Sequence, residues 1–337
     1  MSLSRRSSLR LLAAAAGTAA LAPLVACQQG RRRRGGVGPW RVGILQYVQV
    51  RAVDVTREGV LQGLARHGFH PGQNLQVLLR QADGSPARCR SLARELVTAD
   101  VDLLVAIGTP ALQAAIAAAS GQLPIVFCYC ANPWGAGAGG SATQHQAQVT
   151  GTVTTTAVEE LLRVAQQLVP NLQQVGLLYN PAEPNSSFEA ELLAQAVAAQ
   201  QLQLVREAVT SVADLPEAFA QLQRQGLQAL IKVEDYVVLQ GFRQLAALAL
   251  RARLPLLAEE PDDAGVPGCL AVVGWRSIQD GERAGELASQ ILRGAAPASL
   301  PIQPPGDPGL WLNRDTARRL GIALPASLVS RATAVLG

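Results

Sequence analysis

Residues 102–119, DLLVAIGTPALQAAIAAA, indicate a strand, a tight turn and a helix in immediate succession. The apolar run 103–107 is typical of a buried parallel strand. Gly108 gives the backbone freedom to turn, Thr109 stands where a helix N-cap belongs, and Pro110 suits the first helical position. Ligands bind at the carboxyl ends of strands in open parallel sheets, so the free N–H groups of this helix form a candidate anion site. An ordinary capped helix is the alternative.

The alternation of strand and helix continues on both sides of this stretch, in two sets. Strands are expected at 41–45, 75–80, 103–107, 124–129 and 148–154, and then at 174–179, 202–209, 228–233 and 255–258. Helical patterns lie between them, at 54–67, 87–99, 110–119, 158–168, 187–200, 214–225 and 238–251. Such alternation predicts right-handed crossovers and parallel sheets. Two sets are too many for one compact sheet, so we predict an α/β fold of two doubly wound lobes, with joints near Thr150 and after Cys269.

Residues 1–26 have the pattern of a signal peptide. Arginines at positions 5, 6 and 10 precede an apolar run, 11–25, that is too short and too rich in alanine to span a bilayer comfortably. The segment closes on Leu24-Val25-Ala26-Cys27, which resembles the lipobox of bacterial lipoproteins and predicts lipidation of Cys27. The arginine pair resembles a twin-arginine signal apart from Ser8, and general-secretion signals also contain such pairs, so both routes stay open. We expect an exported protein of the cell envelope or periplasm, anchored to a membrane by lipid, with 27–39 as tether.

The charge balance does not indicate nucleic-acid binding. The chain has 29 basic and 25 acidic residues; without the three arginines of the signal and the four at 31–34, 22 basic residues remain. Next to a lipid anchor, residues 31–34 would either attract anionic head groups weakly or act as a solvated spacer. The histidines show no metal-ligand spacing. Cysteines 89, 128, 130 and 269 are interpreted as small buried hydrophobic residues, although an exported protein could pair them.

No motif indicates catalysis or a cofactor. Residues 135–140, GAGAGG, satisfy the dinucleotide pattern G-x-G-x-x-G, but the polar stretch 141–148 that follows is not helical, so no helix N-terminus would hold a pyrophosphate. We interpret them as a flexible loop. The sequence has neither a G-x-S-x-G elbow nor a P-loop. We therefore expect neither an enzyme nor a cofactor, and we ascribe Lys232, the one lysine of the chain, to codon bias.

Short motifs spread over the chain after residue 40 carry a family resemblance. They include Arg57-Glu58-Gly59, Gly72-Gln73-Asn74-Leu75, residues 106–110, Val149-Thr150-Gly151, Leu178-Tyr179-Asn180-Pro181 and Leu320-Gly321-Ile322. In their order and spacing the chain resembles the two-lobed solute-binding proteins of ABC transporters, in the group whose better-known members bind tryptophan, tyrosine or similar amino acids. The resemblance implies a fold like that of type I periplasmic binding proteins, whose last segments recross. Lobe 1 would comprise 40–150 plus about 271–302, and lobe 2 would comprise 151–270 plus about 303–337.

The strand ends that would face the cleft between the lobes supply the candidate ligand-binding residues. They are Tyr47, Gly108, Thr109, Asn132 and Trp134 in lobe 1, and Tyr179, Asn180, Asp235 and Glu260 in lobe 2. The carboxylate of a zwitterionic amino acid would take the Thr109 hydroxyl and the N–H groups of the following helix. Its ammonium would take Asp235, which the resemblance aligns with an acidic residue of the family.

Each of these residues also has a purely structural interpretation. Asp235 would cap the next helix, Tyr47 would belong to the core, and Trp134 would sit on a mobile loop. Asn132 stands where the family often has Asp. If Asp235 does not hold the ammonium, either Glu234 or Glu259 would replace it or the ligand would carry no positive charge.

The leading hypothesis is a lipid-anchored, monomeric receptor that captures a small polar organic solute, amino-acid-like, for an ABC permease and ATPase. A sensory protein that presents the same lobes to a membrane signalling partner is the first alternative. A cell-envelope enzyme on a doubly wound fold is the second. The export signal, and the lack of a helix-turn-helix segment, exclude a cytoplasmic regulator of similar shape. Neither nucleic acid nor a metal is expected as a partner.

Overall fold

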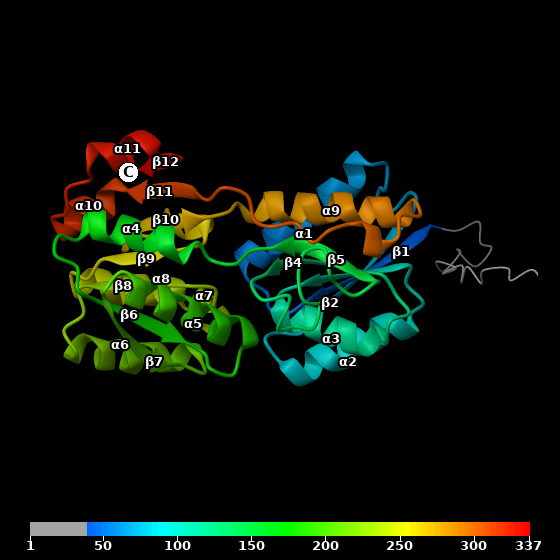
Figure 1. Cartoon of the computed structure of the whole chain (residues 1–337), viewed down its shortest axis with the longest axis horizontal. Helices are drawn as coiled ribbons and strands as arrows, with labels where there is room; N and C mark the ends of the chain where they lie inside the picture. Colours follow the sequence, from blue (N-terminus) through cyan, green and yellow to red (C-terminus); the bar gives the residue numbers. More distant parts are fainter. Residues whose placement is uncertain (1–38) are drawn as a thin grey trace, which may run out of the picture. The chain divides into compact units, whose positions relative to one another are not determined.

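The computed structural model of the protein describes residues 39–337, which carry two β-sheets flanked by helices (Figure 1). The first sheet has five strands in the order β2-β1-β3-β4-β5, and the second has seven in the order β12-β11-β10-β9-β8-β6-β7. This confirms the predicted α/β class with two doubly wound lobes. The predicted signal peptide, Cys27 and the tether up to residue 38 lie outside the described residues.

The first lobe follows the predicted alternation. Its five parallel strands are β1 (Trp40–Gln46), β2 (Leu75–Gln81), β3 (Leu103–Ile107), β4 (Ile125–Cys130) and β5 (Val149–Val153). Helices α1 (Arg51–Arg66) and α9 (Ser277–Leu292) cover one face of the sheet, and α2 (Pro86–Thr98) and α3 (Thr109–Ala119) cover the other (Figure 1). Both faces of the sheet are therefore buried, as in other all-parallel sheets.

The second lobe has a larger, mixed sheet. Its strands are β6 (Gln174–Tyr179), β7 (Gln203–Ala208), β8 (Ala229–Ile231), β9 (Leu256–Ala258), β10 (Cys269–Gly274), β11 (Gly309–Asn313) and β12 (Ala334–Leu336), of which β10 and β11 pair antiparallel. One core cluster includes α4 (Val158–Leu168), α5 (Pro184–Ala199), α10 (Arg314–Leu320) and α11 (Ala326–Arg331). A second cluster includes α6 (Leu215–Arg224), α7 (Tyr236–Gln240) and α8 (Phe242–Arg251).

Three segments cross between the lobes, and the first two begin a few residues later than expected. β5 stays in the first sheet to Val153, so the first crossing follows residue 153 rather than 150. β10 pairs with β9 and β11, which places residues 271–274 in the second lobe and not in the first. Gln303 still bridges to Thr152, so the third crossing follows residue 303. The sequence pattern misplaced these joints because the strands keep pairing through to their carboxyl ends.

Helix α9 returns to the first lobe and packs on α1 at backbone contact distance. Gly59 and Gly63 of α1 face Gly281 and Gly285 of α9. A Cβ on Gly281 would lie 2.0 Å from the carbonyl oxygen of Thr56, so this position accepts glycine alone without a shift of the backbone. This close packing holds α9 on the first lobe, although the chain reaches α9 from the second lobe.

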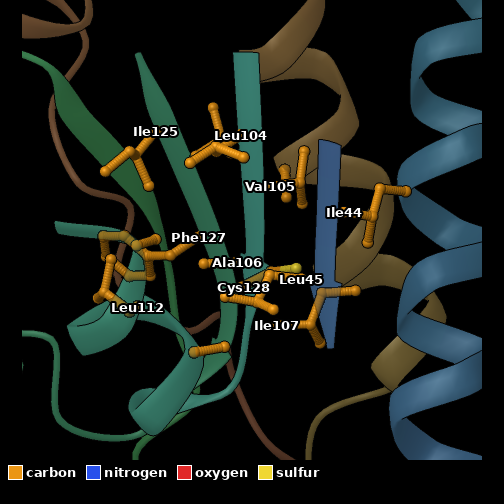
Figure 2. Close-up of a cluster of buried hydrophobic side chains, with 14 of the residues drawn as sticks. Ile44, Leu45, Leu104, Val105, Ala106, Ile107, Leu112, Ile125, Phe127 and Cys128 are labelled. Carbon is orange, nitrogen blue, oxygen red and sulfur yellow. The ribbon is translucent and has the colours of Figure 1, made fainter. Parts of the chain in front are cut away.

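Apolar side chains of β1, β3 and β4 fill the core of the first lobe, with Leu112 of α3 against them (Figure 2). Ile44, Leu104 and Phe127 have no exposed surface. All five residues of β3 are buried, which is why the run 103–107 is continuously apolar. The four described cysteines are free and buried, as interpreted from the sequence: Cys89, Cys128, Cys130 and Cys269.

The turn after β3 differs from the prediction at Thr109. Gly108 is the N-cap, with a φ of 105° that side-chain-bearing residues rarely adopt. Thr109 is the first helical residue, is fully buried and makes no capping hydrogen bond. Its hydroxyl lies 3.4 Å from Cys130 Sγ and accepts a hydrogen bond from the N–H of Asn132. The hydroxyl predicted to bind a ligand carboxylate is used inside the first lobe.

Candidate functional site

A small cavity lies where strand ends of the two lobes meet. The first lobe contributes Tyr129 from β4 and Asp280 from α9, and the second contributes side chains that follow β8 and β9. The cavity encloses about 20 Å³, close to the space that one water molecule needs. Its lining residues are Tyr129, Thr154, Glu234, Glu259, Glu260, Trp275, Ser277 and Asp280.

Direct contacts between the lobes close the cavity. The Tyr129 hydroxyl of the first lobe donates a hydrogen bond of 3.0 Å to Glu260 Oε2 of the second. At the rim, Arg51 Nε lies 3.1 Å from Asp262 Oδ2. A ligand larger than water therefore requires the lobes to part, which is the hinge motion of two-domain binding proteins.

Tyr129 is aimed at the second lobe by an irregular backbone. The pairing of β4 with β5 shifts register between Phe127 and Cys130, and Tyr129 has a φ of 49°, in the left-handed region. Its N–H donates a hydrogen bond of 2.8 Å to Asp280 Oδ2. Strained backbone of this kind persists where surrounding contacts hold it. Asp280 therefore fixes the conformation that brings the phenol into the cavity.

Glu260 is the acceptor at the centre of the cavity. Its side chain is buried, and the Ser277 hydroxyl lies 3.0 Å from Oε1 and 3.2 Å from Oε2. Burial raises the pKa of Glu260 to about 8, with a further contribution from Asp263. A cation entering the cavity would stabilise the ionised carboxylate and lower this pKa again.

Glu234 is a second buried carboxylate of the cavity. Its two oxygens accept long hydrogen bonds from Thr154, at 3.3 Å, and from the Tyr236 hydroxyl, at 3.4 Å. Burial raises its pKa well above the usual value, and Glu189 and Glu259 raise it further. Glu234 forms no ion pair with another described residue, so a positive charge placed beside it would be stabilised.

Lys232 is buried near the cavity and is paired with two carboxylates. Its Nζ is 2.5 Å from Glu259 Oε1 and 3.4 Å from Asp263 Oδ2, and its side chain is 1% exposed. Burial alone would lower the pKa of Lys232, but the two carboxylates outweigh burial and hold the pKa above its usual value. Codon bias therefore does not account for this lysine, because it balances two buried carboxylates.

Asp235, the residue predicted to bind an ammonium, turns into its own lobe. Its Oδ1 accepts the N–H of Val238 at 2.7 Å and so caps α7. Its Oδ2 accepts the N–H of Asn180 and the Ser186 hydroxyl, both at 2.6 Å. The carboxylate has three strong donors and does not line the cavity. Asp235 therefore has the position expected from its structural interpretation, in which it caps the next helix.

Two other predicted residues of the first lobe, Tyr47 and Gly108, pack against Tyr236 of α7. Tyr47 is 2% exposed, its hydroxyl donates to the carbonyl of Gly84, and its ring centroid lies 5.2 Å from that of Tyr236. An ideal Cβ on Gly108 would lie 2.6 Å from the Tyr236 hydroxyl oxygen. Tyr236 thus covers the start of α3, where the ligand carboxylate was predicted to bind.

The remaining predicted residues lie away from the cavity. Asn132 Oδ1 accepts the N–H of Gly135, and Trp134 packs against the first core. The Tyr179 ring lies under the Arg206 guanidinium, 5.8 Å from its centroid. The side-chain oxygen of Asn180 accepts a hydrogen bond from the N–H of Ala182.

Of the predicted ligand-binding residues, Glu260 lines the cavity and the others do not. Sequence reasoning missed Tyr129, which lies in a strand that is otherwise core, and Ser277 and Asp280, which reach the cavity on a helix from late in the chain. A polar pair in the first turn of α9, directly after a buried strand, was the available signal.

Two doubly wound lobes with a polar cavity between them are the architecture expected from the family resemblance. The family model of ABC transporter substrate binding proteins matches residues 41–336. The chain belongs to this family, whose members bind solutes and are not enzymes.

Several known proteins are similar to this chain. A tyrosine-binding protein from Clostridioides difficile (strain R20291) is 25% identical over 279 residues, which cover 83% of this chain and 80% of that protein. A conserved domain protein from Vibrio cholerae has a structure that matches with a TM-score of 0.84 at 30% identity, over 88% of this chain and 99% of that chain. An ABC domain from Streptococcus pneumonia in complex with L-Trp matches with a TM-score of 0.83 at 24% identity, over 89% of this chain and 100% of that chain.

No helix among residues 39–337 combines the length and the apolar character that crossing a membrane requires. The same residues contain no group of His, Cys, Asp or Glu side chains arranged to hold a metal ion.

Proposed function

We propose that this protein is the solute receptor of an ABC importer and that it binds an amino-acid-like solute through an ammonium group in the cavity between the lobes. One observation carries the proposal: Glu234 and Glu260 are buried at the cavity, and neither pairs with a cation among the described residues. Buried carboxylates are costly unless a positive charge accompanies them. The ammonium of a ligand supplies that charge.

The names of two similar proteins support an amino-acid-like ligand. One is a tyrosine-binding protein, and the other was solved in complex with L-Trp. Tyrosine and tryptophan both carry an ammonium group. The ligand need not be aromatic, because the cavity is lined mainly by carboxylates and hydroxyls.

In this proposal the ligand-binding residues differ from those predicted from the sequence. Glu234 and Glu260 bind the ammonium, and Tyr129 and Ser277 hold Glu260 in place. Asp235 shapes the site indirectly, by fixing the start of α7 and hence Tyr236.

A thermal-shift screen of amino acids and small amines tests the function. A ligand at about a hundred times its Kd should add about 2.7 kcal/mol of stability. Small-angle scattering should show that the same ligand shifts the protein toward the closed arrangement of the lobes. If no amino acid and no small amine stabilises the protein, the proposed function is contradicted. Glu217→Gln, an exposed carboxylate on α6, is the control variant for binding.

We also propose that the receptor is exported, lipid-anchored through Cys27 and monomeric, and that it delivers its solute to a permease and ATPase. Cys27→Ser should release the protein from the membrane fraction and abolish labelling with fatty acid. A wild-type protein that is already soluble and unlabelled would contradict the anchor. Loss of export in the double variant Arg5→Lys, Arg6→Lys would assign the twin-arginine route, and normal export would assign the general one.

A further inference from the structure

We propose, on the basis of the proposed function, that the solute carries more positive than negative charge and enters the cavity with a primary ammonium that has no carboxylate beside it. Basic amino acids and diamines possess such an end. The inference concerns the class of solute, and it separates this receptor from one that recognises a neutral amino acid through its zwitterionic head.

Negative charge exceeds positive charge around the cavity. Four of the eight lining residues are acidic. Arg283 lies 3.3 Å from Asp280 Oδ1 and also donates to the carbonyl of Pro304. Lys232 forms ion pairs with Glu259, which lines the cavity, and with Asp263, which does not. Both cations are thus committed.

Glu234 and Glu260 remain without a counter-ion among the described residues. Their hydrogen-bond partners are hydroxyl groups and, for Glu260, also the backbone N–H of Asp262; these donors solvate a carboxylate but do not neutralise it. Neutralisation must come from protons or from a ligand cation. Two such carboxylates on one cavity favour a ligand whose charge there is positive.

Glu259 provides an independent observation. Its Oε1 accepts a hydrogen bond from Lys232, while its Oε2 is buried and has no hydrogen-bond partner among residues 39–337. The side chain is 10% exposed and lines the cavity. A buried acceptor without a donor costs free energy. An ammonium has three donors, so it can satisfy this oxygen and a neighbouring carboxylate together.

The cavity offers a ligand carboxylate no comparable partner. While the lobes are closed, the predicted anion site at the start of α3 is covered by Tyr236 of the second lobe, whose hydroxyl oxygen lies 2.6 Å from where a Cβ of Gly108 would be. The lining hydroxyls already donate to carboxylates: Tyr129 and Ser277 to Glu260, and Thr154 to Glu234. The carboxylate of an amino acid would therefore lie outside this cavity. A basic amino acid can bind in this way, because its side-chain ammonium is several bonds away from its carboxylate.

Calorimetric titration with three probes at pH 7.5 tests the inference. L-Lysine has two ammonium groups, L-norleucine has nearly the same carbon skeleton without the side-chain ammonium, and 1,5-diaminopentane has two ammonium groups and no carboxylate. We expect lysine to bind about 100-fold more tightly than norleucine, the effect of a charge-assisted hydrogen bond in a buried site. Glu260→Gln should reduce that ratio to about tenfold or less, and Glu217→Gln should leave it unchanged.

Every outcome decides a question. Diaminopentane binding as tightly as lysine supports a diamine end as the recognised group, and lysine alone binding tightly supports a basic amino acid. Norleucine binding as tightly as lysine overturns the charge inference and leaves the proposed function standing. Failure of every amino acid and amine to bind overturns the proposed function as well.

Discussion

The two lobes share one architecture but present different chemistry to the cavity between them. The first lobe contributes hydroxyls, from Tyr129 and Ser277, and one carboxylate, Asp280, that is already bonded to a backbone N–H and to Arg283. The second contributes Glu234, three residues after the end of β8, and the pair at 259–260, directly after β9; both strands have only three residues. Because these strands end early, the charged residues that follow them reach the cavity. In the proposed function, recognition of the ligand is therefore concentrated in the second lobe.

Neighbouring carboxylates in the second lobe have different tasks. Glu234 faces the cavity, while Asp235 caps α7 within the lobe. Glu259 pairs with Lys232, while Glu260 accepts the contact from Tyr129 across the cleft. In both pairs one residue stabilises the lobe and the other is available to a ligand or to the opposite lobe. Substitutions at individual residues should therefore separate effects on stability from effects on ligand binding.

Removal of Lys232 should have the largest effect on stability. Lys232→Met leaves Glu259 and Asp263 as buried carboxylates without their cation, which should lower the free energy of unfolding by about 3–5 kcal/mol. Urea denaturation measures the change. Arg224→Met, which removes an exposed ion pair with Glu217, is the matched control and should change stability by less than about 1 kcal/mol. Equal effects of the two variants would show that the buried network is unimportant.

The first lobe should be most sensitive where α1 and α9 touch. Gly281→Ala places a Cβ 2.0 Å from a backbone oxygen of α1, and overpacking of this kind costs about 1–3 kcal/mol. Gly306→Ala, at a position with no atom within 4 Å, should leave stability nearly unchanged. The free energies of unfolding of both variants decide the point. A tolerated Gly281→Ala would mean that the helices separate easily.

The second lobe should make the unliganded protein less stable as pH rises. Burial raises the pKa of Glu260 and Glu189 to about 8 and that of Asp263 to about 7, so between about pH 5 and 8 the folded state binds more protons than the unfolded one. Stability from these groups is complete below their unfolded pKa and is lost as pH rises through the folded pKa. The free energy of unfolding should fall by at least about 1 kcal/mol from pH 5.5 to 8.5. Glu189→Gln should flatten this slope, and a rise in stability would contradict the assignment.

Much of the fold could be predicted from the sequence because burial leaves a clear pattern. Residues 103–107 are apolar at every position since β3 is covered on both faces. The helix from 238 to 251 was predicted as one piece, whereas the chain forms α7 and α8 with Gly241 between them. The joints between the lobes were misplaced by a few residues, because the sequence carries no mark of where a strand leaves its neighbours.

The site was harder to predict for a physical reason. Glu234 and Asp235 are neighbours in the loop after β8, and the sequence did not show that Glu234 faces the cavity while Asp235 caps α7. Asp280 and Ser277 reach the cavity only because α9 recrosses and packs on glycines of α1. Such long-range placement leaves no local signal. Tyr236 likewise covers the helix start that the Gly-Thr-Pro turn offered to a ligand.

The most direct test compares Glu234→Gln with Asp235→Asn by calorimetric titration of the amine that binds wild type most tightly. We expect Glu234→Gln to weaken binding by about 10- to 100-fold, because it removes a charge that faces the ligand. Asp235→Asn should keep the affinity and lower the melting temperature, because an amide can still cap α7 through its oxygen, but its NH2 group cannot accept the hydrogen bonds that Oδ2 accepts from the N–H of Asn180 and the Ser186 hydroxyl. The reverse result, with affinity lost in Asp235→Asn and retained in Glu234→Gln, would contradict the assignment of ligand binding to the cavity carboxylates.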